Sequence, residues 1–173
     1  MISIRTETAA DTTAREALLD AAYGRSRFRK PSENIRRGRQ PAEGLSLVAV
    51  EGDRIVGTVR LWDVDCGGKT GLLLGPLAVA CDRQCEGIGA ALATAAIEAA
   101  RRSGHGAIVL VGDAAYYGRF GFTSEKTGGL AMPGPFERDR LLGLELVPGA
   151  LDAADGLIAP AGRPVTKPRR RAA

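Results

Sequence analysis

The sequence predicts a single mixed α/β domain, in which helices flank a central sheet. Strand-like and helix-like segments alternate along the chain of 173 residues, and this alternation is the first indication of that class. The second is an alanine-rich helical segment between two apolar, strand-like segments, an order that predicts a right-handed parallel crossover. Hydrophobic residues make up 45% of the chain, which is enough for one compact core.

The N-terminal half predicts a strand, two helices and an antiparallel hairpin. Residues 2–5 alternate as a strand, and Asp11 precedes a helix whose apolar positions share one face: Ala14, Ala17, Leu18, Ala21 and Ala22. A short basic helix is expected over residues 32–38. Residues 45–50 and 55–62 read as strands that a tight turn at residues 51–54 joins.

The C-terminal half supplies the crossover and ends in a tail. Residues 71–80 predict a strand, and the following helix over residues 89–102 presents an apolar face of Ile88, Leu92, Ala95, Ala96 and Ala99. The continuous apolar run at residues 107–111 is typical of a strand covered on both faces. A short helix is expected at residues 114–118, and residues 130–132 and 142–147 are expected to pair as late strands. Residues 1–158 are thus predicted to form the domain and residues 159–173 a basic, flexible tail.

Charge and cysteine content limit the classes of partner. The net charge is +4, with basic residues clustered in residues 25–39 and 167–171. Such clusters suit acidic ligands or nucleic acid, but no interleaved aromatic residues or zinc spacing accompany them, so nucleic acid is disfavoured. Cys66, Cys81 and Cys85 are expected to be free thiols, and with His105 as the only histidine no metal is expected. The apolar runs are shorter than the roughly 20 residues of a membrane span, so we expect a cytoplasmic protein without a membrane partner.

A glycine-rich turn precedes the alanine-rich helix, with the pattern Gln84-x-x-Gly87-x-Gly89. Unpaired N–H groups and the helix dipole favour an anion at such a helix start, and glycines let the anion approach the backbone. Arg83 or Gln84 could then close over a bound pyrophosphate. A dinucleotide motif would need a small residue at Leu92, and the Lys-Ser or Lys-Thr of a P-loop is missing. The pattern alone leaves a phosphate cradle and a plain strand-to-helix turn as alternatives.

Three segments in combination narrow that choice: Gly75-Pro76-Leu77-Ala78-Val79, the turn at residues 84–92, and residues 116–122, Tyr-Tyr-Gly-Arg-Phe-Gly-Phe. Their order and spacing over residues 72–122 resemble the GNAT superfamily of acyl-CoA-dependent N-acetyltransferases. Within it, the last segment is similar to that of a bacterial group. The resemblance implies a mostly antiparallel sheet in which the fourth strand and the parallel strand after it splay apart. The splay follows a bulge, which we expect at Gly75-Pro76. It also implies acetyl-CoA as co-substrate and an amine as acceptor, without a metal.

The resemblance carries roles to particular positions of this sequence. It implies that the strand edge at Leu77, Ala78 and Val79 binds the pantetheine arm and that the Val79 N–H stabilises the oxyanion. It implies that Tyr117 protonates the leaving thiolate and that Tyr116 fills a core aromatic position. The full set of implied coenzyme-binding residues is Leu77, Ala78, Val79, Arg83, Gln84, Cys85, Glu86, Gly87, Ile88, Gly89, Ala90, Asp113, Tyr116 and Tyr117. Cys81, Cys85, Glu86 and Asp113 depart from the residues usual at their positions.

These implications predict an N-acetyltransferase that moves an acetyl group from acetyl-CoA to a primary amine of a small molecule or peptide by direct attack in a ternary complex. The general base is open, with Glu33, Asp63, Asp65 and ordered water as candidates, and Arg25, Arg27 and Arg29 are candidates for binding an anionic group of the acceptor. The resemblance allows a homodimer. A non-catalytic acyl-CoA sensor or interaction module of the same fold, and a nucleotide-binding fold of another kind, are the alternatives.

Overall fold

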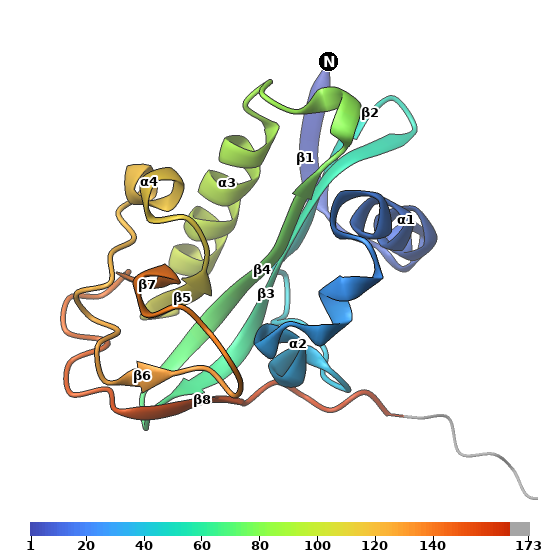
Figure 1. Ribbon diagram of the computed structural model, residues 1–173. Coiled ribbons are helices and arrows are strands. Elements are labelled where there is room, and N and C mark those ends of the chain that lie inside the picture. The colour runs from blue at the N-terminus through green and yellow to red at the C-terminus, as the bar shows by residue number, and fades with distance from the viewer. Residues whose placement is uncertain (167–173) are drawn as a thin grey trace, which may run out of the picture.

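The computed structural model describes residues 1–166, which form an eight-stranded mixed sheet with helices on both faces (Figure 1). The main strand order is β1-β2-β3-β4-β5-β7, and β8 pairs with β3 and β6. The strands are β1 (Ile2–Thr6), β2 (Ser46–Glu51), β3 (Arg54–Cys66), β4 (Thr70–Val79), β5 (Ala107–Val111), β6 (Leu130–Ala131), β7 (Leu141–Glu145) and β8 (Gly156–Pro160). The α-helices are α1 (Thr12–Tyr23), α2 (Pro31–Arg36), α3 (Ile88–Arg102) and α4 (Ala114–Tyr117). Short 3-10 turns complete the chain: η1 (Ala9–Asp11), η2 (Arg25–Arg29), η3 (Cys81–Arg83), η4 (Gly118–Phe120) and η5 (Arg138–Arg140).

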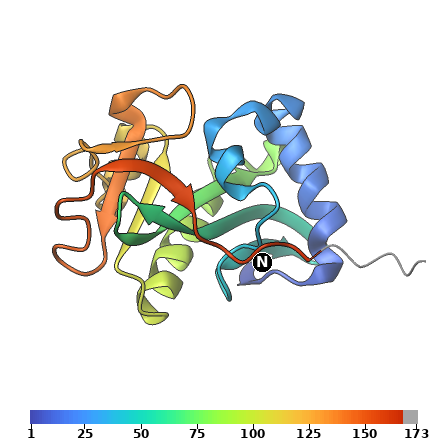
Figure 2. The same ribbon diagram turned by 90° about the horizontal axis from the view of Figure 1, so that it is seen from below.

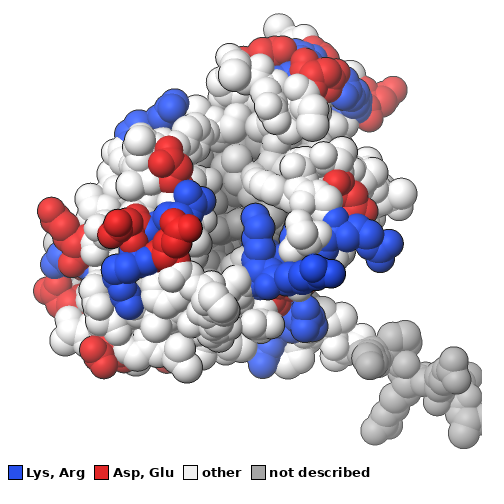
Figure 3. All heavy atoms as spheres, viewed as in Figure 1, with Lys and Arg blue, Asp and Glu red and all other residues white. Residues whose placement is uncertain are grey.

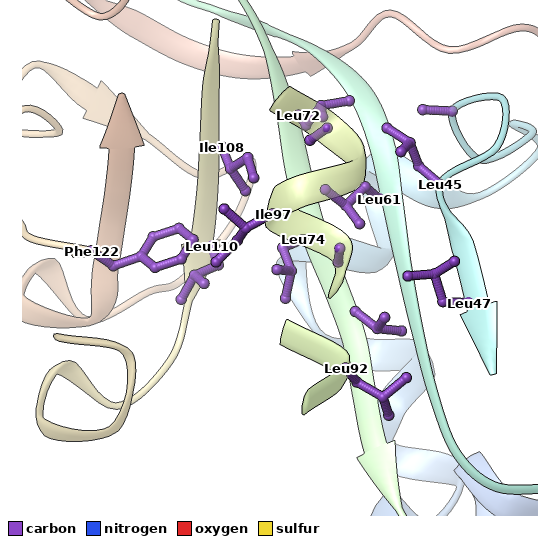
Figure 4. Close-up of a cluster of buried hydrophobic side chains, with 14 of the residues drawn as sticks. Leu45, Leu47, Leu61, Leu72, Leu74, Leu92, Ile97, Ile108, Leu110 and Phe122 are labelled. Carbon is purple, nitrogen blue, oxygen red and sulfur yellow. The ribbon is translucent and has the colours of Figure 1, made fainter. Parts of the chain in front are cut away.

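Alternation along the strands places α1 and α3 on opposite faces of the sheet (Figure 2). Leu47 and Ala49 of β2 belong to the core beneath α3, whereas Val48 and Val50 of the same strand pack against α1. The larger core lies on the α3 side, where Leu92 of the helix packs with leucines of β3 and β4 (Figure 4). The predicted mixed α/β class is therefore confirmed.

The predicted crossover is also confirmed. β4 and β5 are parallel neighbours, with Leu72 opposite Ile108 and Leu73 opposite Val109, and α3 connects them. Strand β5 has the predicted bounds, and α3 begins one residue before the predicted start. Small residues of α3 allow this close packing, since Ala93, Ala96 and Ala100 are all fully buried.

The buried face of α1 differs from the predicted one. Ala14, Ala17 and Ala21 are exposed, and the helix buries Arg15, Leu18 and Leu19 instead. Arg15 occupies a core-facing position because its guanidinium pairs with the carboxylate of Glu7 at 2.9 Å. A count of apolar residues treats arginine as a surface residue and so misplaces the face.

The late strands do not pair with each other as predicted. β7 lies antiparallel to β5, and β6 pairs with β8, a strand that the sequence reading missed. The predicted tail therefore starts too early, because Ala159 and Pro160 belong to β8 and Val165 donates a hydrogen bond to the Gly38 carbonyl at 2.8 Å. The basic segment 167–171 lies outside the described residues. Among the helices of residues 1–166, none is long and apolar enough to cross a membrane.

Candidate active site

The parallel strands β4 and β5 pair at only two positions and then separate. Their last paired residues are Leu73 and Val109, but β4 continues to Val79 and β5 to Val111. A V-shaped opening therefore forms between the C-terminal ends of the two strands. The start of α3 and the segment from Asp113 to Phe122 follow these ends directly.

A β-bulge accompanies this separation, at the position that the sequence indicates. Val59 of β3 pairs with Leu77 and Leu61 pairs with Leu74, so two β4 residues, Gly75 and Pro76, oppose one β3 residue. The Gly75 carbonyl accepts a hydrogen bond from the Trp62 indole of β3 at 2.6 Å, which stabilises the bulge. Bulges bend a strand, and this one turns the rest of β4 away from β5.

Beyond the bulge, β4 presents alternate backbone groups to the opening. Ala80 donates its N–H to Val56 of β3, and residues of an antiparallel strand alternate in direction. Ala78 therefore also points its backbone groups at β3, opposite Thr58, while those of Leu77 and Val79 point away from β3. The sequence implied that the backbone groups of Leu77, Ala78 and Val79 all bind the pantetheine arm. Those of Ala78 are not available for this, because they face β3.

The turn before α3 presents a run of unused backbone donors. None of the N–H groups of residues 84–90 donates a hydrogen bond to another residue between Met1 and Thr166. Gly87 is the N-cap and has φ of +81°, a conformation that glycine adopts without strain. Cys85 also has a positive φ, of +63°. These donors lie at the start of α3, where the helix dipole is positive, so the turn can bind an anion.

The two glycines of this turn have different roles. A side-chain carbon on Gly87 would contact nothing within 4 Å, so Gly87 serves the backbone conformation and leaves the surface open. A carbon on Gly89 would lie 3.0 Å from the Tyr116 hydroxyl. Gly89 therefore makes room for Tyr116, which the sequence reading did not anticipate.

Arg83 is held on the outer side of the turn by two carboxylates. Its guanidinium donates to Glu86 at 2.8 Å and also pairs with Glu51 of β2. These hydrogen bonds raise the pKa of Arg83 above its usual range and lower the pKa of the Glu86 carboxyl. The negative charge of Glu86 is thus compensated locally, and Arg83 is engaged before any ligand arrives.

Tyr117 lies in the opening, and its ring is set by aromatic neighbours. The ring centroids of Tyr116 and Phe122 lie 4.9 and 5.9 Å from that of Tyr117. Burial, with smaller contributions from the nearby Tyr23 and Tyr116, raises the pKa of the Tyr117 phenol to about 12. The phenol is therefore protonated at neutral pH and can donate a proton.

Asp113 positions the two tyrosines. Its carboxylate accepts a hydrogen bond from the Tyr116 N–H at 3.0 Å, and its carbonyl accepts one from the Tyr117 N–H at 2.9 Å. Asp113 is therefore the N-cap of α4. A carboxylate oxygen is a good acceptor for this cap.

A cavity of about 740 Å³ extends from this opening between the N-terminal helices and the C-terminal segment (Figure 3). Tyr117, Leu77, Leu110 and Val111 line one part of it. Residues of α1, α2 and the 132–140 segment line the rest. In Figure 3 a hollow crosses this face, and Lys and Arg side chains border it.

Tyr23, at the end of α1, is a lining residue that the sequence reading missed. Its hydroxyl donates a hydrogen bond to the Leu77 carbonyl, and the Lys30 ammonium lies 4.6 Å from the centre of its ring. Burial raises the pKa of this phenol. Tyr23 thus joins α1 to the free edge of β4, across 54 residues of sequence.

Only some of the candidate bases and candidate arginines line the cavity. Of the three acidic residues, Glu33 lines the cavity, whereas Asp63 and Asp65 lie on β3 outside it. Of the three arginines, only Arg27 lines the cavity, and its guanidinium pairs with Glu16 and Asp20. Arg36, which belongs to the basic cluster of residues 25–39, lines it as well, and so does Arg140, which the sequence reading did not name. The three cysteines are free thiols, as predicted, and residues 1–166 contain no cluster of three metal-ligating side chains.

Comparison with known families assigns this fold. The model of the Acetyltransferase (GNAT) family matches residues 11–122. The chain belongs to the GNAT acetyltransferase family. It is therefore an acyltransferase, and its splayed β4–β5 pair is that of the GNAT fold.

Solved GNAT structures resemble this chain over most of their length. A GNAT family N-acetyltransferase of Escherichia coli, solved with CoA, is 26% identical with a TM-score of 0.78, over 91% of this chain and 88% of that one. A GNAT family acetyltransferase of Brucella melitensis, solved with acetyl-CoA, is 28% identical with a TM-score of 0.70, over 92% and 95%. The ribosomal-protein-S18-alanine N-acetyltransferase of Escherichia coli, 16% identical with a TM-score of 0.56 over 85% and 95%, shares the fold alone. Comparison with curated proteins found no match.

Proposed function

We propose that this GNAT protein transfers an acetyl group from acetyl-CoA to a primary amine, which attacks the thioester directly in a ternary complex. The observation that carries the proposal is the alignment of three features around one opening: the free backbone edge of β4, the unused N–H groups of residues 84–90, and the protonated phenol of Tyr117. The two relatives solved with CoA and acetyl-CoA support it.

The residues present fit this co-substrate. The N–H groups of residues 84–90 would hold the pyrophosphate, with Gly87 leaving the approach open. Leu77 and Val79 would hold the pantetheine arm through backbone groups that β3 does not use. Acetyl-CoA supplies the thioester as the activated acyl group.

The chain supplies one hydrogen-bond or proton donor for each of the two negative charges that develop, on the carbonyl oxygen and on the leaving thiolate. Attack by the amine places negative charge on the carbonyl oxygen, and the Val79 N–H is directed into the opening where it can stabilise that charge. A thiolate then leaves, and Tyr117 can donate its proton as the bond breaks, because a phenol is protonated at neutral pH and burial raises its pKa further. Glu33, held 3.3 Å from Arg36, is the candidate acid that lines the cavity and could accept the proton of the amine directly or through water.

Thiol release with a panel of amines tests the proposal. Tyr117→Phe removes the proton donor but keeps the ring, so we expect kcat to fall by about 10² to 10⁴ with little change in the KM for acetyl-CoA. Tyr116→Phe is the matched control, because its hydroxyl lies beside Gly89 at the turn. That variant should affect the KM for acetyl-CoA more than kcat. Equal kcat in wild type and Tyr117→Phe would contradict the role of Tyr117.

A thermal shift, read together with the turnover assay, separates the enzyme from the alternative sensor. Acetyl-CoA at a hundredfold excess over its dissociation constant should stabilise the fold by about 2.7 kcal/mol. Stabilisation without turnover of any amine would favour a non-catalytic acyl-CoA sensor. No stabilisation by any acyl thioester would overturn both readings.

A further inference from the structure

We propose that the acceptor is a small amine that carries a carboxylate or phosphate group, and that Lys30, Arg36 and Arg140 bind this anionic group in the cavity beside Tyr117. The inference rests on the proposed function, since it names the class of acceptor for the same site. It replaces the three arginines singled out from the sequence with Lys30 between η2 and α2, Arg36 of α2 and Arg140 of η5, which the fold brings to one cavity.

The cavity wall carries an excess of positive charge. Its basic residues are Arg15, Arg27, Lys30, Arg36, Arg37, Arg60 and Arg140. Its acidic residues are Glu16, Glu33 and Glu137. An enclosed wall with one sign of charge attracts ligands of the opposite sign.

Three of the arginines are already compensated and therefore belong to the framework. Arg15 pairs with Glu7 at 2.9 Å, and Arg60 pairs with the same carboxylate. Arg27 pairs with Asp20 at 3.0 Å and with Glu16. The Glu7 pairs link α1 to β3 and the Arg27 pairs link η2 to α1, so the charges of these three arginines are already neutralised within the protein.

Four cations remain, and of these Arg37 is exposed and donates to the Phe28 carbonyl at 3.2 Å. Within the described part of the chain, Lys30 and Arg140 form no salt bridge, although the Lys30 ammonium lies 4.6 Å from the centre of the Tyr23 ring. The Arg36 guanidinium donates to the Glu33 carboxylate at 3.3 and 3.4 Å, which is longer than the 2.7 to 2.9 Å typical of a strong charged pair. Arg36 also lies at the bulge, with Nη1 3.5 Å from the position of a side-chain carbon on Gly75.

These three cations line the same cavity. Burial lowers the pKa of Lys30, and the charges of Arg36 and Arg140 lower it further. Burial likewise lowers the pKa of Arg36. Like charges brought together in a partly buried wall destabilise one another, and a bound anion would relieve that repulsion.

The positions of these residues also limit the size of the acceptor. Lys30, Arg140 and Tyr117 line the same cavity, so one ligand can reach all three, and the charge of Arg140 acts on both Lys30 and Tyr117. Leu77, Leu110 and Pro76 add apolar surface to the wall. A compact amine with its acid group a few bonds from the nitrogen fits this arrangement.

Matched pairs of amines test the inference. Each anionic amine is compared with a neutral amine of the same length: glycine with ethylamine, β-alanine with propylamine, and 4-aminobutyrate or 3-aminopropylphosphonate with butylamine. We expect wild type to prefer the anionic member of at least one pair by about tenfold or more in kcat/KM. The carboxylate and phosphonate arms distinguish the two sources of negative charge.

Single substitutions identify the residues responsible. Lys30→Gln and Arg140→Gln should each reduce the anionic-to-neutral ratio of kcat/KM about tenfold, mainly through the KM of the anionic amine. Arg25→Gln is the matched control, because it removes the same charge from η2 at an exposed position outside the cavity. Arg25→Gln should leave the ratio unchanged, and thermal unfolding checks that all variants fold.

Equilibrium binding of the same probes to the complex with CoA supplies a readout that does not require turnover. If neutral amines react or bind as well as their anionic partners, or if Lys30→Gln and Arg140→Gln leave the ratio unchanged, the inference is overturned while the proposed function stands. Absence of acetyl-CoA binding would overturn the proposed function instead.

Discussion

The position of the Tyr117 ring depends on the absence of a side chain at Gly112. A carbon on Gly112 would lie 2.5 and 2.8 Å from Cε2 and Cδ2 of that ring, and 3.1 Å from Leu110. Gly112 is buried and directly follows β5, so the neighbouring backbone has little freedom to move. The glycine therefore lets the tyrosine fold back onto the end of the strand.

Gly112→Ala is expected to displace the phenol without removing it. We predict a fall in kcat of about tenfold or more, because misplacing a proton donor removes much of its contribution. Gly118→Ala is the matched control in the same segment, since an added carbon there would contact nothing within 4 Å and φ is −57°. Steady-state kinetics compare the two. An unchanged kcat in Gly112→Ala would show that the ring adjusts without loss.

Among the elements, α3 depends most strictly on the identity of the residue at its start. Gly87 must hold a left-handed conformation while its neighbours direct their N–H groups outward. Gly87→Ala meets no steric obstacle, so its effect is confined to the backbone, at a cost of about 1 to 2 kcal/mol in stability.

A matched glycine separates this stability cost from an effect on binding. Gly44 has φ of +73°, also with nothing within 4 Å of an added carbon, and does not line the cavity. We expect Gly87→Ala and Gly44→Ala to lower the free energy of unfolding by similar amounts in denaturant titrations. Only Gly87→Ala should also raise the KM for acetyl-CoA, and an equal KM in both variants would argue against the turn as the pyrophosphate site.

Elements whose signals are local in the sequence could be predicted, and elements that depend on distant partners could not. The crossover, the bulge at Gly75 and the turn at Gly87 follow from periodicity and glycine placement within short segments. Strand β8 is only five residues long and takes its form from pairing with β3 and β6, so no local pattern marks it. The buried Arg15 on α1 similarly depends on Glu7.

The site divides in the same way. Tyr117 and the turn before α3 lie in contiguous motifs, and the sequence indicated both. Tyr23, Arg36 and Arg140 come from segments more than a hundred residues apart at the extremes, and only the folded chain brings them to one cavity. Tyrosine and arginine side chains are common on protein surfaces, so the sequence alone did not identify these three as residues of one site.

At the scale of the whole molecule, ion pairs tie together different elements, from six to 28 residues apart in the chain. Arg5 of β1 holds Asp11 before α1 at 2.7 Å, and Arg54 of the β2–β3 hairpin holds Asp82 before α3 at 2.7 Å. Lys126 likewise holds Asp152 at 2.7 Å. The hydrogen bonds from these cations lower the pKa values of the three aspartates in the folded protein.

Acid should therefore destabilise the fold, because protonation of these aspartates removes their ion pairs. The ordinary pKa of these carboxyls is 3.8, and the folded values are lower, so at acidic pH the unfolded chain binds more protons than the folded one. Their contribution is present above about pH 4 and is lost as the pH falls below it. We predict that Tm decreases steadily between pH 5 and about pH 3.

Asp11 provides the decisive variant, because its side chain is only 9% exposed whereas those of Arg54 and Asp82 are 55% and 60% exposed. Salt screens exposed pairs more than shielded ones, so high salt should weaken the Asp82 contribution and retain most of that of Asp11. Asp11→Asn should lower Tm at pH 7 and flatten its decline in acid, with Asp82→Asn as the exposed counterpart. A Tm profile of the same slope in wild type and Asp11→Asn would mean that the Arg5–Asp11 pair does not couple β1 to α1.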